Sequence, residues 1–274
     1  MKQQRLRNYW LSKLIIHPRI SSATHKGPRP SQEDRIVIRR VDATNLSGIL
    51  LAVADGHGGD ETSSYVAQQL SDGLFDRMVA DNKNLNDVLK TTFQYLNDST
   101  LELSKKTFAH YESGTTLSVV YIPDGQDKLH IGIIGDSPVI LARKDGKFHI
   151  SPEHNARSNE EERKAAEQRG GLFSDGYLYS PSTRMGLQMT RDIGCHAMGD
   201  VLQRYPDIYD FAIHDGDVLI VASDGLLDPA HSSTDEDVRR LTKLVLEGAE
   251  AQELIDDALR RQTGDNVSVV IYRH

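Results

Sequence analysis

The stretch ILLAVADGHGGDETSSYV, residues 49–66, joins an apolar strand to a tight turn that holds a carboxylate and an imidazole. Residues 49–54 are all aliphatic, which is typical of a buried strand. Five turn residues follow directly: Asp55, Gly56, His57, Gly58 and Gly59. An Asp-Gly pair is ordinary turn chemistry, and the chain contains seven such pairs. The rest of the sequence has to decide between a simple turn and a functional site.

Composition is that of an ordinary globular protein. The chain has 274 residues, of which 38% are hydrophobic and 26% are charged. The formal net charge is −8, and because residues 1–27 carry six Lys or Arg and no acid, the rest carries −14. Such acidity argues against the clustered basic surface that binds nucleic acid. No apolar run approaches the ~20 residues that span a bilayer. We therefore expect a monomer with no nucleic-acid or membrane partner.

The basic start of the chain allows two interpretations. An organelle transit peptide is rich in Arg and poor in acids. Alternatively, four apolar residues at helical spacing predict a helix over about residues 2–14: Leu6, Tyr9, Trp10 and Leu14. Trp10 is the only tryptophan, and a segment that is removed seldom holds such a core anchor. The pattern favours the helix, and with it a cytoplasmic protein.

Strand-like and helical segments come in pairs. Four pairs of strand-like runs predict hairpins: residues 36–41 with 47–54, 115–122 with 128–134, 138–142 with 147–150, and 209–214 with 217–222. Helical spacing predicts helices over residues 61–79, 85–101, 160–168, 235–246 and 252–261. This order predicts antiparallel sheets covered by helices, an α+β fold. No linker or repeat divides the chain, so we expect a single domain over residues 1–274.

Four aspartates lie at the ends of strands that we expect to be buried. Asp55, Asp136 and Asp224 each follow an apolar run, and Asp265 precedes the final strand. A carboxylate beside a core is costly unless it is paired or binds a metal, and no Lys or Arg lies next to these four. Oxygen ligands suit Mg²⁺ and Mn²⁺, whereas no His/Cys spacing supports zinc. The pattern favours a site for divalent cations.

A further acidic site, GPRPSQEDRIV, begins at residue 27. Glu33 and Asp34 directly precede a strand, and Arg29 lies four residues before Glu33. Alone, the acids would be read as a solvated turn. Beside the other carboxylates, however, an Arg that can clamp an oxyanion through two hydrogen bonds changes the interpretation. Two cations, a phosphate-sized anion and an Arg predict metal-assisted phosphoryl hydrolysis.

Seven blocks of the sequence carry a family resemblance. They are PRPSQED, VADGHGGDE, SGTTLSVV, IGIIGDS, LQMTRDIG, IVASDGLLD and GDNVSVVIY, in that order. Over roughly residues 20–274 the chain resembles the metal-dependent protein serine/threonine phosphatases, the PP2C or PPM family. The resemblance implies a central β-sandwich of two antiparallel sheets flanked by helix pairs, and a phosphoprotein substrate.

The resemblance also implies a metal centre with two tightly bound Mn²⁺ or Mg²⁺ ions and, as in many family members, a weaker third. By resemblance Asp55 bridges the two ions, and the Gly56 carbonyl binds one of them. Four acids are implied as further direct or water-mediated ligands: Glu33, Asp34, Asp224 and Asp265. Asp136 matches a ligand of the third ion. Arg29 matches the residue that holds the substrate phosphate, and His57 matches the proposed general acid. A metal-activated water would attack phosphorus without a phosphoenzyme.

The single cysteine, Cys195, fits this mechanism because it lacks the His-Cys-x5-Arg pattern of cysteine phosphatases. Its position is nevertheless one of three departures from the family pattern. Cys195 stands where an Asp is usual, Pro138 where an Arg is usual, and Glu153-His154 where Asp-His is usual. Glu153-His154 and Cys195 lie in or near a predicted flap, about residues 160–194. Three flap residues are candidates for contact with a phosphoprotein, or simply exposed: Tyr177, Tyr179 and Arg184.

Two alternative functions remain. FAIHDGDVL resembles the start of a haloacid-dehalogenase-type phosphatase, with Asp215 as nucleophile and Asp217 as acid. That motif should open its domain, but it lies close to the end of this chain. The second alternative is a catalytically weak PP2C-like protein that acts as a regulatory binding module. Such proteins usually lose metal ligands, whereas all four expected ligands are present here: Glu33, Asp55, Asp224 and Asp265.

Overall fold

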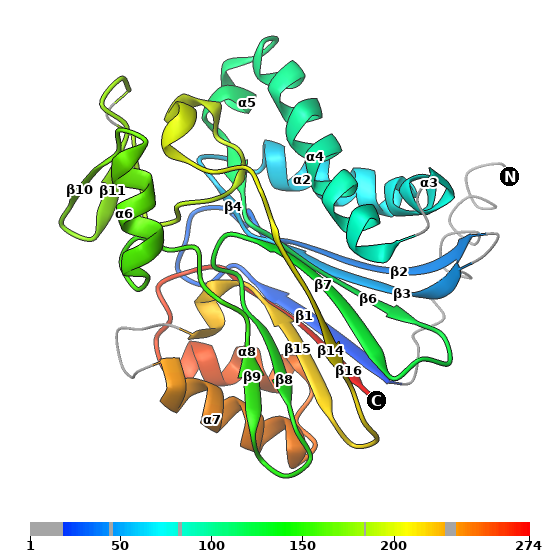
Figure 1. Cartoon of the computed structure of the whole chain (residues 1–274). Helices are drawn as coiled ribbons and strands as arrows, with labels where there is room; N and C mark the ends of the chain where they lie inside the picture. Colours follow the sequence, from blue (N-terminus) through cyan, green and yellow to red (C-terminus); the bar gives the residue numbers. More distant parts are fainter. Residues whose placement is uncertain (1–18, 44–45, 82–83, 184, 228–233) are drawn as a thin grey trace, which may run out of the picture.

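The computed structural model describes residues 19–43, 46–81, 84–183, 185–227 and 234–274; the predicted basic helix over residues 2–14 lies outside them. Two five-stranded antiparallel sheets form the centre of the molecule (Figure 1). The first sheet has the order β14 (Asp207–Ala212), β7 (Lys128–Ile134), β6 (Leu117–Pro123), β3 (Leu46–Ala54) and β2 (Arg35–Ala43). The second has the order β1 (Ile20–His25), β16 (Val267–Arg273), β15 (Val218–Ala222), β8 (Val139–Ala142) and β9 (Phe148–Ile150).

The two sheets face each other, and helices cover their outer faces (Figure 1). Over the first sheet lie α2 (Glu61–Ser71), α3 (Leu74–Asp81) and α4 (Leu85–Ser104), and α5 (Phe108–Glu112) packs against α4 and α2. Over the second lie α7 (Thr234–Leu246) and α8 (Ala251–Arg260). The α+β fold with a central β-sandwich and flanking helices is confirmed. Among the described helices, none combines the length and apolarity that a bilayer crossing requires.

Strand β3 shows why residues 49–54 are uniformly aliphatic. Successive side chains of a strand point to opposite faces. Leu50, Ala52 and Ala54 pack in the core beneath α2, α3 and α4. Ile49, Leu51 and Val53 pack in the core between the two sheets, against residues of β15 and β16. Because both faces of β3 are buried over residues 49–54, the first charged residue comes where the strand ends, at Asp55.

A smaller unit lies beside the sandwich at the predicted flap. It consists of α6 (Glu160–Gln168) and a three-stranded sheet of β10 (Leu172–Ser174), β11 (Tyr177–Tyr179) and β12 (Gly186–Leu187). A separate core that includes Ala166, Leu178 and Met198 holds this unit together. Met198 belongs to the 3-10 helix η1 (His196–Val201), which follows the flap.

Three details of the predicted fold were wrong. The helix expected over residues 61–79 is two helices, because Gly73 adopts a φ of +90° between α2 and α3. The hairpin expected for residues 209–214 and 217–222 does not form: β14 pairs with β7 in the first sheet, whereas β15 pairs with β8 and β16 in the second. The turn at Asp215-Gly216 therefore connects the two sheets. Strand β1 was not predicted at all.

Candidate active site

One edge of the sandwich collects the predicted site residues. The C-terminal ends of β3, β7 and β15 and the N-terminal ends of β2 and β16 meet there, because neighbouring strands are antiparallel. Glu33 and Asp34 precede β2, Asp55 follows β3 and Asp136 follows β7. Asp224 opens η2 (Asp224–Leu227) after β15, and Asp265 precedes β16.

Electrostatics shows that these carboxylates share one site. Burial raises the pKa of Asp55 well above its ordinary value, and the charges of Asp34, Asp224, Asp136 and Asp265 raise it further. Burial also raises the pKa of Asp224, again with help from Asp136 and Asp265. Like charges held this close repel one another when all are ionised. The ionised cluster therefore carries an excess of negative charge that a bound cation would neutralise.

Two acids of the cluster are almost fully buried and have an oxygen without a hydrogen-bond partner. Asp34 is 3% exposed, and burial raises its pKa to about 6, although the Ser223 hydroxyl donates to Oδ2 at 2.8 Å. Its Oδ1 has no partner. Asp136 accepts from Asn155 Nδ2 at 2.7 Å through Oδ2, and its Oδ1 is likewise unpartnered. Buried, unsatisfied carboxylate oxygens fit the hard oxygen ligands that Mn²⁺ and Mg²⁺ prefer.

The turn after β3 brings backbone close to the acids. A Cβ added at Gly56 would lie 2.6 Å from the Glu33 carbonyl oxygen and 2.7 Å from Ser63 Oγ, so only glycine fits. The Glu33 carboxylate accepts from the Gly59 N–H at 3.2 Å and from Ser31 Oγ at 2.6 Å. These contacts tie the Glu33 segment to the Asp55 turn. Carboxylates and backbone oxygens together form a donor set that fits two divalent cations.

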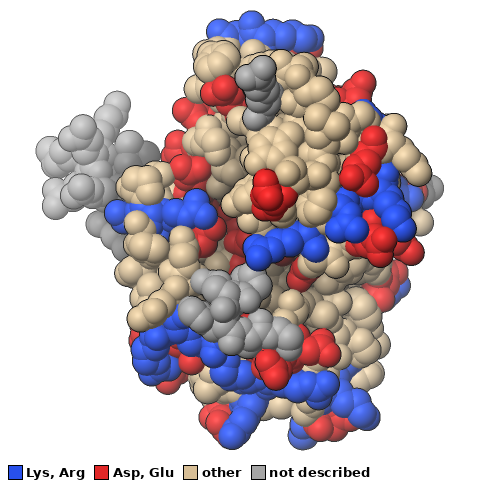
Figure 2. All heavy atoms as spheres, turned by 90° about the vertical axis from the view of Figure 1, so that its left-hand side faces the viewer, with Lys and Arg blue, Asp and Glu red and all other residues tan. Residues whose placement is uncertain are grey.

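Arg29 lies at the rim of the cluster. Its Nη2 donates to Asp265 Oδ2 at 2.5 Å and its Nε to the Gly264 carbonyl at 2.9 Å, while its side chain is 53% exposed. In this structure the guanidinium is thus paired with an acid of the cluster. Figure 2 shows this face of the molecule, where basic and acidic side chains are mixed and acidic atoms lie in the recess at its middle.

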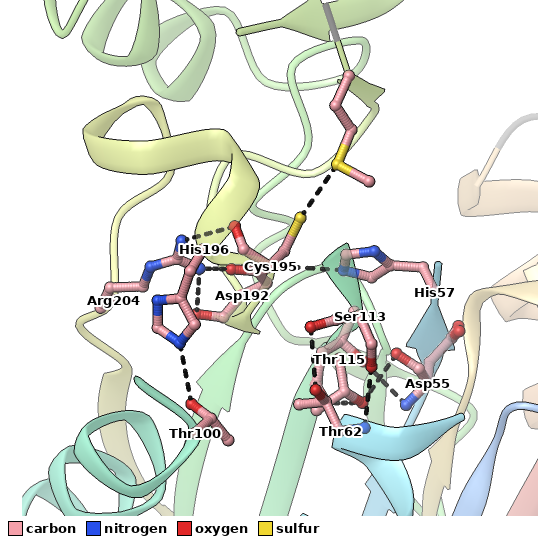
Figure 3. A network of polar contacts seen from close by, with 12 residues as sticks. Asp55, His57, Thr62, Thr100, Ser113, Thr115, Asp192, Cys195, His196 and Arg204 are labelled. Atoms are coloured by element: carbon pink, nitrogen blue, oxygen red, sulfur yellow. Dashed lines mark hydrogen bonds and ion pairs between the residues drawn. The ribbon is translucent and has the colours of Figure 1, made fainter. Parts of the chain in front are cut away.

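His57 lies beside the cluster on a short sheet formed by β4 (Gly56–His57), β5 (Gly114–Thr115) and β13 (Ile193–Gly194). Its side chain is 14% exposed, and its Nε2 lies 3.1 Å from Oδ2 of the fully buried Asp192 (Figure 3). Burial lowers the pKa of His57 to about 4, opposed by the nearby Asp136 carboxylate.

The sequence analysis missed Asp192 and its partner Arg204, which form an ion pair. The signal for Asp192 was available: a carboxylate between Arg191 and Ile193, in a block that should be buried, needs a partner. Arg204 carries no local signal, because only folding brings it to Asp192. Cys195 lies in the same group, and its Sγ is within 4.8 Å of ligand atoms of His57 and Asp192.

Cys195 has the properties of a core residue. It is fully buried, its thiol donates to Met185 Sδ at 3.5 Å, and burial raises the pKa of the thiol to about 12. A thiol with so high a pKa is not a nucleophile at neutral pH. Because Arg204 already neutralises Asp192, the group of His57, Asp192 and Cys195 fits a hydrogen-bonded network better than a metal site.

The haloacid-dehalogenase interpretation is wrong. Asp215 lies in an exposed turn, and Asp217 immediately precedes β15, at the opposite end of that strand from Asp224. The Asp217 carboxylate accepts from Arg143 Nη1 at 2.7 Å and from the Lys144 N–H at 3.0 Å. These contacts give Asp217 a structural role.

Comparisons with known proteins decide the family. The family model described as "Protein phosphatase 2C" matches residues 20–267. The chain belongs to the protein phosphatase 2C family. "Probable protein phosphatase 2C 45" of Oryza sativa subsp. japonica is 29% identical over 259 residues, covering 92% of this chain and 86% of that one. "Probable protein phosphatase 2C 76" of Arabidopsis thaliana is 27% identical over 258 residues, and the match covers 91% of this chain but 58% of the relative.

Solved structures share the phosphatase 2C fold. A C. elegans sex determining protein superimposes with a TM-score of 0.76 at 25% identity, covering 92% of this chain and 64% of that one. The catalytic domain of the serine/threonine phosphatase PstP, solved in complex with two manganese ions, gives a TM-score of 0.61 at 22% identity and covers 92% of this chain and 96% of its own.

In this phosphatase 2C chain, the residues that depart from the family pattern make identifiable contacts. His154 Nδ1 accepts from the Gly135 N–H at 3.1 Å, so it supports the turn that carries Asp136. The charge of the adjacent Glu153 contributes to the raised pKa of Asp136, although burial is the larger cause. Pro138 accepts from the Ala222 N–H at 3.0 Å. In the flap, Tyr177 is 41% exposed, and Arg184 lies outside the described residues.

Proposed function

We propose that this chain hydrolyses phosphoserine and phosphothreonine in proteins by direct attack of water, without a phosphoenzyme. The observation that carries the proposal is the cluster of mutually repelling carboxylates around Asp55 at one edge of the sandwich. Family membership supports it, as does the two-manganese complex of PstP, a protein of the same fold. A phosphoprotein substrate, a monomer and a cytoplasmic location belong to the same proposal and rest on sequence alone.

Five residues would hold two Mn²⁺ or Mg²⁺ ions: Asp55, Gly56 through its carbonyl, Glu33, Asp224 and Asp265. Asp34 would act through water, and Asp136 would take part in a weaker third site. Bound ions would neutralise charge on the phosphoryl oxygens and acidify the attacking water.

The remaining steps belong to side chains of this chain. Arg29 binds equatorial phosphoryl oxygens through its guanidinium, which must then turn from Asp265 toward the substrate. His57 gives a proton to the serine or threonine oxygen as the P–O bond breaks. Burial disfavours the imidazolium and lowers the pKa of His57, so the protonated ring is a stronger acid than a free imidazolium.

Phosphate release from a phosphothreonine peptide tests the proposal. The purified chain should release no phosphate in EDTA and should turn over once Mn²⁺ is in excess. Undiminished release in EDTA contradicts the metal assignment. Absence of release at every Mn²⁺ concentration, with Mn²⁺ binding intact, would instead indicate the regulatory binding module.

A further inference from the structure

Asp192 is a buried carboxylate that the proposed chemistry does not use directly. It precedes β13, which pairs with β5, and β5 in turn pairs with β4, where His57 lies. This three-stranded sheet brings Asp192 Oδ2 to 3.1 Å from His57 Nε2 (Figure 3). Asp192 is fully buried, so the contact is protected from water.

Arg204 determines how Asp192 can act. Its guanidinium forms an ion pair with Asp192 Oδ1 and also donates to the Cys195 carbonyl at 3.2 Å. A carboxylate paired with a buried guanidinium is ionised and only accepts hydrogen bonds. His57 Nε2 must therefore be the donor. In the neutral ring the proton then lies on Nε2, and Nδ1 carries the lone pair.

The other ring nitrogen has no partner in the protein. His57 Nδ1 makes no hydrogen bond to any described residue and is closed to solvent in this structure, so a substrate oxygen reaches it only if the atoms that cover it move. The backbone at Gly114 lies directly against this contact. A Cβ at position 114 would lie 2.5 Å from Asp192 Oδ2 and 2.6 Å from His57 Nε2. Glycine at position 114 thus allows His57 and Asp192 to meet.

We propose that Asp192, held ionised by Arg204, is a positioning residue that fixes the His57 ring with its Nε2–H toward Asp192 and leaves Nδ1 to transfer the proton. This inference rests on the proposed function, in which His57 protonates the leaving oxygen. The Nδ1 proton of the imidazolium goes to the serine or threonine oxygen as the P–O bond breaks. The neutral ring that remains keeps the Nε2 proton, and the proton that the attacking water releases balances the one given to the leaving oxygen.

The tautomer of His57 is the first test, and it requires no turnover. In metal-free protein with ¹⁵N-labelled histidine, assigned by comparison with His57→Gln, Nδ1 should show the shift of an unprotonated ring nitrogen at pH 7.5. In Asp192→Asn the amide should turn its oxygen to the donor-only Arg204 and its NH₂ to Nε2, so the proton should move to Nδ1. A wild-type ring protonated on Nδ1, or an unchanged tautomer in folded Asp192→Asn, overturns the proposal.

The second test compares two leaving groups at saturating Mn²⁺. A serine or threonine oxygen needs a proton as it leaves, whereas nitrophenolate does not. Asp192→Asn should slow a phosphothreonine peptide at least about tenfold, the usual worth of an orienting partner, and slow p-nitrophenyl phosphate clearly less. Equal losses on both substrates would mean that Asp192 is only structural and would overturn the proposal.

A matched control exists in the same chain. Asp207 also joins a His and an Arg: His154 Nε2 lies 3.0 Å from Oδ2, and Arg191 Nη1 lies 2.9 Å from Oδ1. Asp207→Asn makes the same chemical change away from His57, and should leave the His57 tautomer and the ratio of the two rates unchanged.

A wild-type chain without Mn²⁺-dependent turnover of either substrate would refute the proposed function, while the tautomer would still test the role of Asp192.

If Asp192→Asn does not fold, Arg204→Lys replaces it. This substitution keeps a cation beside Asp192 and should retain the Nε2–H tautomer. A switch to Nδ1–H in folded Arg204→Lys contradicts the proposal, because Asp192 would still be ionised.

Discussion

Asp55 is a buried carboxylate of the acid cluster. It lies where an apolar strand ends, and four other aspartates raise its pKa beyond the effect of burial. Removing its charge has two opposite consequences. Two bound cations would lose a carboxylate that would hold them, whereas the metal-free cluster would lose repulsion between like charges.

We expect Asp55→Asn to lower Mn²⁺-dependent turnover at least about 100-fold, since a metal contributes several kcal/mol to the reaction. The same variant should unfold at a higher temperature than wild type in EDTA, because the cluster loses a negative charge. Calorimetric titration with Mn²⁺ should show the loss of at least one tight site. Asp215→Asn, in the exposed turn at the other end of β15, is the matched control and should change neither property. Wild-type turnover in Asp55→Asn would refute the role of Asp55.

Cys195 gives a prediction about selectivity between phosphatase classes. Because the thiol is fully buried and burial raises its pKa to about 12, iodoacetamide should label it slowly in the folded protein. Mass spectrometry of the treated sample gives the labelled fraction, and phosphopeptide assays of the same sample should show most of the activity. Loss of activity in proportion to labelling would assign Cys195 a role in the reaction.

The short sheet of β4, β5 and β13 is the element that couples the metal cluster to the Asp192 network. It carries Gly56 and His57 on one side and Gly194 on the other, with β5 between them. Its middle strand contains Gly114, where there is no space for a side chain.

We expect Gly114→Ala to separate His57 from Asp192 and so to slow phosphopeptides more than p-nitrophenyl phosphate. The methyl group would have to displace both side chains by several tenths of an ångström. Gly248→Ala is the control: it strains a φ of +105° in the loop before α8, but an added Cβ there meets nothing within 4 Å. That variant should cost stability alone, as measured by thermal unfolding beside the two rates. An unchanged rate ratio in folded Gly114→Ala would show that this contact does not direct the proton.

Local pattern explains which elements could be predicted. The hairpins of β2 with β3, β6 with β7 and β8 with β9 follow from apolar runs separated by short turns, and so do the aspartates at the strand ends. The break between α2 and α3 depends on a single glycine φ, and the separation of β14 from β15 depends on which sheet each strand joins. Asp192 and Arg204 meet only after folding, so no local spacing reveals their ion pair.

At the scale of the whole molecule, the acid cluster links folding stability to pH and to metal binding. An acid whose pKa is higher in the folded than in the unfolded chain stabilises the fold at pH values below its pKa in the unfolded chain. This contribution is lost as pH rises through its pKa in the folded chain. Burial raises the pKa of Asp34 from 3.8 to about 6 and also raises those of Asp55 and Asp224. The contribution is therefore full below about pH 4 and is lost from Asp34 as pH passes about 6.

We expect the metal-free chain to be more stable at pH 5 than at pH 8, with Asp34 alone contributing on the order of 1 kcal/mol, because only the last part of its titration, up to about pH 6, lies between these two pH values. Urea unfolding in EDTA at the two pH values measures the difference. Excess Mn²⁺ should stabilise the chain more at pH 8, where the ligands are ionised. A metal-free chain that is more stable at pH 8 would contradict the electrostatics of the cluster.

Mn²⁺ stoichiometry measured together with turnover shows whether the acid cluster is a catalytic centre for two metal ions. Metal-free protein at pH 7.5 is titrated with Mn²⁺ in a calorimeter, and phosphate release from a phosphothreonine peptide is followed at each ratio of metal to protein. We predict two tight Mn²⁺ sites per chain and turnover that rises as the second site fills. Turnover that is complete before any Mn²⁺ binds, or a chain that releases phosphate without a tight site, would contradict it.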